Sequence, residues 1–187
     1  MTDLFRSLFV LACLALCAPA QAQLTVQITR GTTAPIPIAV VPFGVQQGPI
    51  PVDVAQVVEN DLERSGRFQG LERGSMLAQP APGQPFDLAD WRLLKTDYLL
   101  IGRVVPDGQQ WAVQFELYNV LTGERLLGYS VPSTPGALKQ AAHRVSDMVY
   151  EKILGVPGAF STRIAYVVVS GVAPQRRYRL VVADADG

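Results

Sequence analysis

The strongest apolar run after the first 30 residues is IPIAVVPF, at Ile36–Phe43. An uninterrupted run of this length that ends near Pro42 is typical of a strand buried on both faces. Residues 52–65 then repeat apolar positions at i, i+4 and i+8, which predicts a helix. The positions in that stripe are Val54, Val58 and Leu62. A short strand near Phe68–Leu71 completes a strand–helix–strand order, which predicts a crossover connection within one sheet.

Alternating and helical patterns continue through the second half of the chain. Three strands joined by short turns predict an antiparallel meander, and they fall at Asp97–Val105, Trp111–Val120 and Arg125–Val131. Two further helices are predicted, the first capped by Asp87 with Trp91 and Leu94 facing inward. They span Leu88–Lys95 and Pro135–Leu154. The expected fold class is therefore α/β, a mixed β-sheet with helices packed on it.

The first 22 residues have the pattern of a cleaved signal peptide. Arg6 precedes an apolar run, Leu8–Ala18, that is too short to span a membrane. Ala20-Gln21-Ala22 then offers small residues at the spacing that a signal peptidase accepts. We expect cleavage after Ala22, secretion to the periplasm and no membrane insertion afterwards. An uncleaved anchor and a lipid on Cys13 or Cys17 are weaker alternatives, and cleavage would leave a mature chain without thiols.

The mature chain is expected to begin with a short alternating strand. Leu24, Val26 and Ile28 point to one side of it, and Gly31 and Pro35 separate it from the apolar run that follows. The pattern fits an edge strand of the chain's own sheet. It fits equally well a strand that leaves and pairs with the sheet edge of another protein.

The C-terminal stretch reads as the opening of a second domain. Gly155, Pro157 and Gly158 stop the last helix. Two β-branched runs then predict a hairpin, Ile164–Val169 paired with Tyr178–Ala183. A lone hairpin is marginal in water. We therefore expect residues 1–22 to be the signal peptide, 23–157 an α/β domain and 158–187 an incomplete second domain.

Composition and motifs favour a binding module over an enzyme. Sixteen basic residues balance sixteen acidic ones, which does not favour nucleic acid as a partner. The sequence holds no G-x-S-x-G, phosphate-loop or His/Cys ligand pattern, so we expect no catalytic residue, cofactor or metal site. His143, the only histidine, is expected on a helix flank, bonded to a neighbouring loop and within reach of Ser146. Asp61 is expected on a solvated helix face.

Several stretches in order along the chain resemble one family, TolB of the Tol–Pal system. They are the leader with its alternating strand, IPIAVVPF, VVENDLERSGRF (Val57–Phe68) and AHRVSDMVYEKILGVPGAFSTRIAYV (Ala142–Val167). The resemblance implies a TolB-type N-terminal α/β domain followed by the first strands of a β-propeller. It also implies a non-enzymatic periplasmic protein that links TolA and Pal, and thereby supports outer-membrane integrity and constriction at cell division.

The same resemblance implies which residues carry these contacts. The mature N-terminal strand would bind TolA, and its residues are Gln23, Leu24, Thr25, Val26, Gln27, Ile28, Thr29 and Arg30. The domain junction would be marked by Gly158, Phe160 and Arg163. Pal would be contacted through the propeller, most of which this chain lacks.

Two alternatives stay open at this point. The chain could be a generic envelope α/β assembly domain of the CsgG-like type, or it could precede the catalytic domain of a propeller-bearing peptidase. The GAFSTRIAYV junction argues against the first alternative, since such domains do not begin a propeller there. A downstream G-x-S-x-G region would favour the second.

Overall fold

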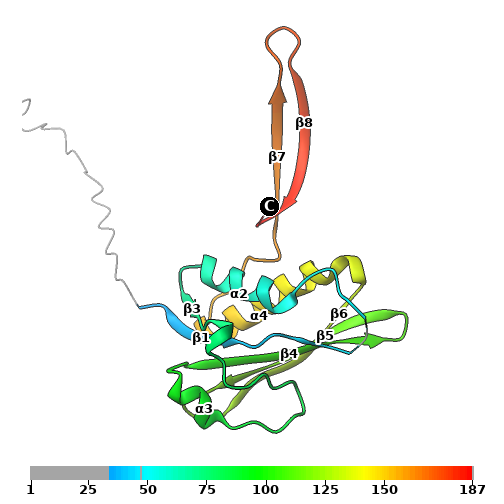
Figure 1. Cartoon of the computed structure of the whole chain (residues 1–187). Helices are drawn as coiled ribbons and strands as arrows, with labels where there is room; N and C mark the ends of the chain where they lie inside the picture. Colours follow the sequence, from blue (N-terminus) through cyan, green and yellow to red (C-terminus); the bar gives the residue numbers. More distant parts are fainter. Residues whose placement is uncertain (1–33, 47, 187) are drawn as a thin grey trace, which may run out of the picture. The chain divides into compact units, whose positions relative to one another are not determined.

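The computed structural model describes residues 34–46 and 48–186, in which a larger mixed sheet and a separate two-stranded sheet are found (Figure 1). The strands of the larger sheet are β1 (Ile36–Val40), β2 (Gly44–Val45), β3 (Phe68–Gly70), β4 (Tyr98–Asp107), β5 (Gln110–Asn119) and β6 (Arg125–Ser133). They lie in the order β3–β1–β4–β5–β6, with β2 paired to β4. The second sheet pairs β7 (Arg163–Ser170) with β8 (Arg177–Asp184).

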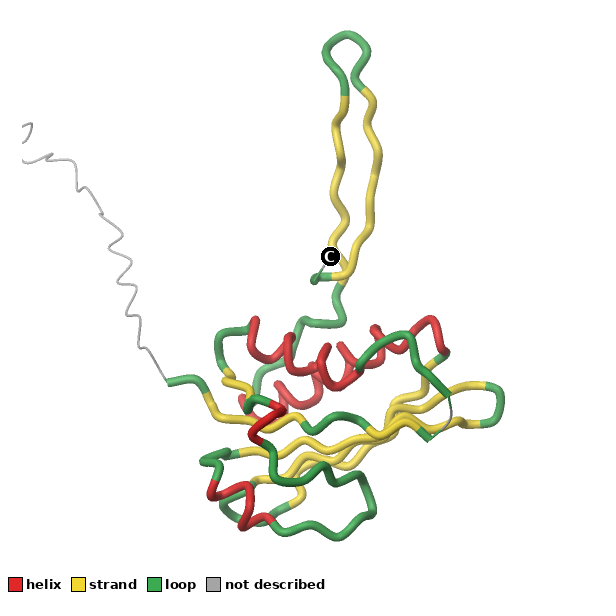
Figure 2. Tube along the Cα trace, in the orientation of Figure 1, coloured by secondary structure: helices red, strands yellow, loops and turns green. Residues whose placement is uncertain are grey.

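Helices cover both faces of the larger sheet, as Figure 2 shows. α2 (Val54–Arg64) and α4 (Leu138–Leu154) lie on one face, and α3 (Leu88–Leu93) lies on the other. Short 3₁₀ turns occur at η1 (Arg73–Ser75) and η2 (Pro135–Ala137). Local chemistry sets the helix ends: the Asp53 and Asp87 side chains accept from the first turns of α2 and α3, and Gly155 ends α4 in the left-handed region.

The predicted strand–helix–strand crossover is confirmed, because β1 pairs in parallel with both β3 and β4. β1 is buried from both sides. Ile38 and Val40 belong to the core under α2 and α4, whereas Ala39 and Val41 belong to the smaller core under α3. Alternate residues of one strand thus face the two helical layers, which explains the uninterrupted apolar run.

The predicted limits of several elements were wrong by a few residues. β1 ends at Val40 instead of Phe43, because Pro42 follows and the Phe43 ring folds against Gly102 of β4. A Cβ on Gly102 would lie 2.3 Å from Phe43 Cε2, so glycine is required there for the ring to pack. α3 stops at Leu93, two residues early, and the last helix begins at Leu138 after a 3₁₀ turn.

The meander β4–β5–β6 is confirmed as antiparallel. β4 and β6 extend two residues further than predicted at their C-terminal ends, and β5 begins and ends one residue early. The paired strands β7 and β8 are likewise confirmed. The predicted signal peptide and the alternating strand at 24–29 lie outside the described residues. Among the residues that the structure does describe, no helix is long and apolar enough to cross a membrane.

Candidate functional site

The segment after α4 is attached to that helix by one carboxylate. Backbone N–H groups of Phe160 and Ser161 donate to Asp147 Oδ1 and Oδ2 over 2.7 and 3.1 Å. Gln140 Nε2, two turns earlier on α4, donates to the Ser161 carbonyl over 3.0 Å. Charge-assisted bonds of this kind are stronger than neutral ones. The GAFS stretch is therefore fixed on the helix and does not act as a free linker.

Two of the three predicted junction residues contribute to this attachment. At Gly158 an added Cβ would lie 2.5 Å from Asp147 Oδ1 and 2.7 Å from Asp147 Cα, so only glycine allows the close approach. The Phe160 ring meets Tyr150 edge-on at 5.5 Å between centroids, and Tyr150 in turn meets Phe68 of β3 at 6.0 Å. Gly158 and Phe160 thus lie together against α4 and the sheet edge.

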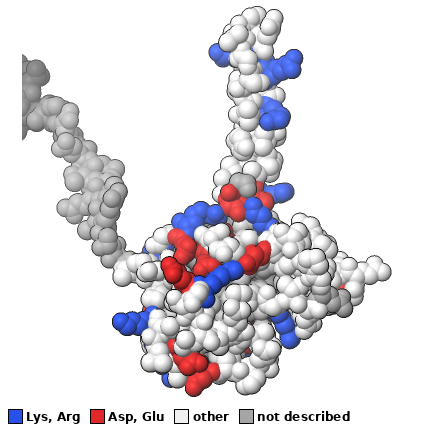
Figure 3. Space-filling model, viewed as in Figure 1, with Lys and Arg blue, Asp and Glu red and all other residues white. Residues whose placement is uncertain are grey.

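The third junction residue, Arg163, opens the hairpin instead. Its Nε lies 3.3 Å from Asp184 Oδ1 at the closing end of β8, which pairs the first and last residues of the two strands. The hairpin leaves many large apolar side chains exposed, namely Ile164, Tyr166, Val167, Val169, Val172, Tyr178, Leu180 and Val182. Figure 3 shows the hairpin mostly white with a few blue side chains, whereas blue and red are interspersed over the α/β domain. An isolated hairpin with this much exposed apolar surface is not a stable unit by itself.

The chain after β8 returns to the same helix. Asp186 Oδ1 lies 2.9 Å from Lys139 Nζ and 3.6 Å from His143 Nε2. Burial favours the neutral carboxyl, but the bond to Lys139 and the nearby His143 outweigh it and hold the pKa of Asp186 below its usual value. The ionised Asp186 carboxylate thus lies beside Lys139 and His143 of α4.

His143 and Asp61 form a buried pair, and both predictions about them were wrong. His143 is fully buried, and its Nδ1 lies 2.7 Å from Asp61 Oδ2 on α2, not from a loop. Asp61 is 1% exposed, so it does not lie on a solvated face. Ser146 does reach this site, because its Oγ donates to the same Asp61 oxygen over 2.7 Å. Arg64 donates to the other oxygen, Oδ1, over 2.6 Å.

This arrangement joins two helices and differs from a catalytic triad. In a triad the serine hydroxyl bonds the imidazole, whereas here the Ser146 hydroxyl and the His143 ring both bond Asp61. A buried carboxylate requires such partners to remain in the interior. The site therefore fixes α2 on α4, next to the helix face that holds Asp186 and the junction.

Asp147 has no local sequence signal, because its partners follow 13 and 14 residues later across a loop. Asp61 does have one. Asp61 follows Val54 by seven residues and Val58 by three, which places it on the buried stripe of α2.

Groups of at least three His, Cys, Asp or Glu side chains suited to a metal ion are absent from residues 34–46 and 48–186.

Comparison with known proteins assigns the fold to a family. The family model for the TolB amino-terminal domain matches residues 24–126. The Tol-Pal system protein TolB of Thioalkalivibrio sulfidiphilus is 44% identical to this chain, and the match covers 100% of this chain. The chain belongs to the TolB family.

Other TolB proteins match in the same way. The Tol-Pal system protein TolB of Methylococcus capsulatus is 42% identical over 89% of the chain. The crystal structure of TolB from Acinetobacter baumannii superposes with a TM-score of 0.70 at 35% identity, over 82% of this chain and 37% of that one. The chain spans 43% and 39% of the two TolB sequences, which is less than half of their length.

Replacing Asp147 with alanine should release the junction from α4. The amides of Phe160 and Ser161 would lose their acceptor, and we expect their hydrogen-exchange protection to fall about 10-fold, equivalent to about 1.4 kcal/mol. Amide exchange followed by NMR measures this directly. Glu151→Ala, an exposed change one turn further along α4, is the control and should leave both amides unchanged. Unaltered protection in Asp147→Ala would show that the loop is held by other contacts.

Proposed function

We propose that this chain is a non-enzymatic, periplasmic protein-binding component of the Tol–Pal system. In this role the N-terminal strand would bind TolA and a whole propeller would bind Pal, and the link between them would support outer-membrane integrity and constriction during cell division. The observation that carries the proposal is the 44% identity to a Tol-Pal system protein TolB along the whole chain. Because the chain spans 43% of that relative, the roles of the whole protein are part of the proposal.

The contact with TolA is proposed for the N-terminal strand, Gln23–Arg30. Its alternation suits β-augmentation, in which backbone hydrogen bonds give affinity and alternate side chains give specificity. Val26 and Ile28 would be the anchors on the sheet-facing side. The match to the TolB amino-terminal domain begins at residue 24, so residues 24–30 of this segment are included in the family domain. Each ladder hydrogen bond contributes about 1 kcal/mol net, which allows exchange between partners.

Deleting residues 23–30 from the mature chain should abolish TolA binding. The shortened chain loses the strand but keeps every described element from β1 onward. We expect affinity for the purified periplasmic part of TolA to fall at least about 100-fold, as a calorimetric titration would measure. The double variant Val26→Lys/Ile28→Lys should have a similar effect. The matched control Thr25→Lys/Gln27→Lys, on the opposite side of the strand, should bind within about 5-fold of the unaltered chain. Undiminished binding after the deletion would refute this assignment.

The contact with Pal is proposed for the propeller that residues 158–187 would begin. The exposed apolar side chains of β7 and β8 support this, since they need further strands to cover them. Titrated separately, the mature chain should bind TolA and show little Pal binding. The proposed domain limits are 1–22 for a cleaved signal peptide, 23–157 for the α/β domain and 158–187 for the start of the propeller.

We further propose that the protein uses no catalytic residue, cofactor or metal. The buried Asp61, His143 and Ser146 support this view, because their mutual bonds occupy them in holding two helices together. The matches to TolB proteins over 82–100% of the chain favour this function over a CsgG-like assembly domain or a peptidase-associated propeller.

A further inference from the structure

Among residues 34–46 and 48–186, no strand pairs with the outer edge of β6. In the described residues β6 ends the strand order and pairs with β5 alone. Two backbone hydrogen bonds at the end of β5 show which of its residues bond to β6 and which to β4. The Asn119 N–H donates to the Glu124 carbonyl on the β6 side, and the Val120 N–H donates to the Asp97 carbonyl on the β4 side. Odd-numbered residues of β5 therefore bond to β6.

The register then fixes which backbone groups of β6 point outward. Phe115 of β5 is opposite Tyr129, and Val113 is opposite Val131, so these residues of β6 bond inward. Gly128, Ser130 and Pro132 consequently direct their backbone groups away from the sheet. All three are exposed. Pro132, which lacks an N–H, occupies an outward position, as is expected of proline in an edge strand.

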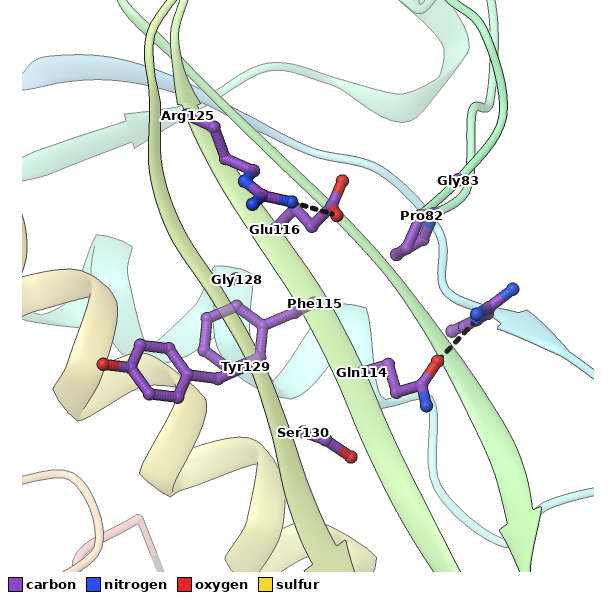
Figure 4. A pocket seen from close by; sticks show the side chains of 10 residues that line it. Pro82, Gly83, Gln114, Phe115, Glu116, Arg125, Gly128, Tyr129 and Ser130 are labelled. Atoms are coloured by element: carbon purple, nitrogen blue, oxygen red, sulfur yellow. Dashed lines mark hydrogen bonds and ion pairs between the residues drawn. The ribbon is translucent and has the colours of Figure 1, made fainter.

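A hollow lies on each side of this edge. The first, of about 420 Å³, is on the sheet face opposite α4, and Figure 4 shows Gln114 and Glu116 between the loop of Pro82 and Gly83 and the strand carrying Ser130. The second, of about 400 Å³, lies between β6 and α4 and is lined by Leu127, Tyr129, Met148, Glu151, Lys152 and Gly155. Side chains of an added strand would point alternately into the two hollows.

The first hollow favours a carboxylate. Arg125 is neutralised by Glu116 at 3.1 Å, and Tyr118 donates to the same carboxylate over 2.7 Å. Burial, together with that bond to Glu116, raises the pKa of Tyr118 to about 12, so the phenol stays neutral. Arg103 Nε donates to the neutral amide oxygen of Gln114 over 2.8 Å. The lining of this hollow thus has two guanidinium groups, those of Arg103 and Arg125, and one carboxylate, that of Glu116, so an incoming acidic side chain would balance the charge.

The second hollow favours a large apolar side chain. Tyr129 is 55% exposed although its ring stacks on Phe115 at 6.3 Å between centroids. Leu127 and Met148 complete an apolar surface beside it. Methionine adapts readily to the shape of a ligand.

We propose that the β6 edge at Gly128–Pro132 receives an extended segment of another protein whose residues alternate between large apolar and acidic. Gly128 and Ser130 exchange backbone hydrogen bonds with it, and the apolar residues enter the hollow beside α4. The acidic residues meet Arg125, whose guanidinium lies beside Gly128 on the same strand. This site accepts a strand, whereas the proposed TolA contact donates one. The proposed TolA contact rests on residues 23–30 and the strand-accepting edge on residues 128–132, so either proposal can fail without the other.

A blocked peptide of about eight residues that alternates leucine and glutamate tests the proposal. Titrated into the ¹⁵N-labelled mature chain, it should shift the amides of Gly128 and Ser130 in a saturable manner. A peptide with lysine in place of glutamate should bind about 10-fold more weakly. The leucine–glutamate peptide N-methylated at alternate amides should lose binding, because it cannot complete the ladder.

Two variants of the chain sharpen the test. Arg125→Gln should weaken binding of the leucine–glutamate peptide about 5-fold, whereas Arg144→Gln, an exposed change on α4, should leave it unchanged. Ser130→Pro should abolish binding without disturbing the ladder to β5; if it fails to fold, the N-methylated peptide makes the same test on the unaltered chain. Shifts confined to β7 and β8, no saturable shift at Gly128 and Ser130, or equal binding of the lysine peptide would overturn the proposal.

Discussion

Replacing Asp61 with alanine is expected to lower the free energy of unfolding by about 3–5 kcal/mol. Asp61 is the shared acceptor of His143 and Ser146, and all three side chains are buried. Without the carboxylate, His143 Nδ1 and Ser146 Oγ lose their bonds to α2, and Ser146 Oγ keeps its bond to the Ala142 carbonyl within α4. His143 Nε2 already lacks a hydrogen-bond partner among the described residues, so the ring would then have none. Each buried polar group left unsatisfied costs about 1–3 kcal/mol.

Urea denaturation followed by circular dichroism measures this loss. Asn60→Ala, the neighbouring exposed residue with a single side-chain bond to Gln56, should change stability by no more than about 0.5 kcal/mol. In a double-mutant cycle, His143→Ala should cost less when Asp61 is already alanine, with a coupling of about 0.5–3 kcal/mol. Additive losses would mean that the two side chains stabilise the fold independently.

Replacing Trp91 with alanine is the second large effect, expected at about 3–5 kcal/mol. Trp91 is 1% exposed and is the largest member of the core under α3, which otherwise consists of Ala39, Val41, Leu99, Ile101 and Val120. α3 has six residues, too few to be stable without packing. We therefore expect α3 to detach while the core under α2 and α4 stays folded.

Limited proteolysis and fluorescence can separate local from global unfolding. Cleavage of Trp91→Ala should concentrate in residues 71–96, and the emission of Trp111 on β5 should remain that of a folded chain at low urea. Leu93→Ala is the matched control, because this side chain lies on the same helix but is 76% exposed. Cooperative loss of both cores in Trp91→Ala would show that the two layers fold as one unit.

Apolar periodicity predicted most of the fold, because each element buries its own stripe or face. The run at Ile36–Phe43, the stripe of α2 and the alternation of β5 are local patterns that tertiary packing reinforced. Element ends were less predictable. β1 stops early through a contact between Phe43 and Gly102, residues far apart in sequence.

Polar contacts across long separations explain what the sequence did not reveal. Asp61 and His143 are 82 residues apart, and each one read alone has ordinary neighbours for a surface helix position. Only the spacings of seven residues from Val54 and three from Val58 indicated that Asp61 is buried. Asp147 is part of the stretch that carries the family resemblance, yet nothing local indicates that it accepts from Phe160 and Ser161.

The close fit between Asp147 and the GAFS stretch bears on where this protein can be cut for expression. A fragment that ends at Leu154, the last residue of α4, would leave the Asp147 carboxylate without the amide of Phe160, and Tyr150 would lose its contact with the Phe160 ring. Extending the recombinant boundary past Ser161 retains those partners within the fragment. The natural unit for biophysical work on the α/β domain therefore includes several residues that the helix limits alone would discard.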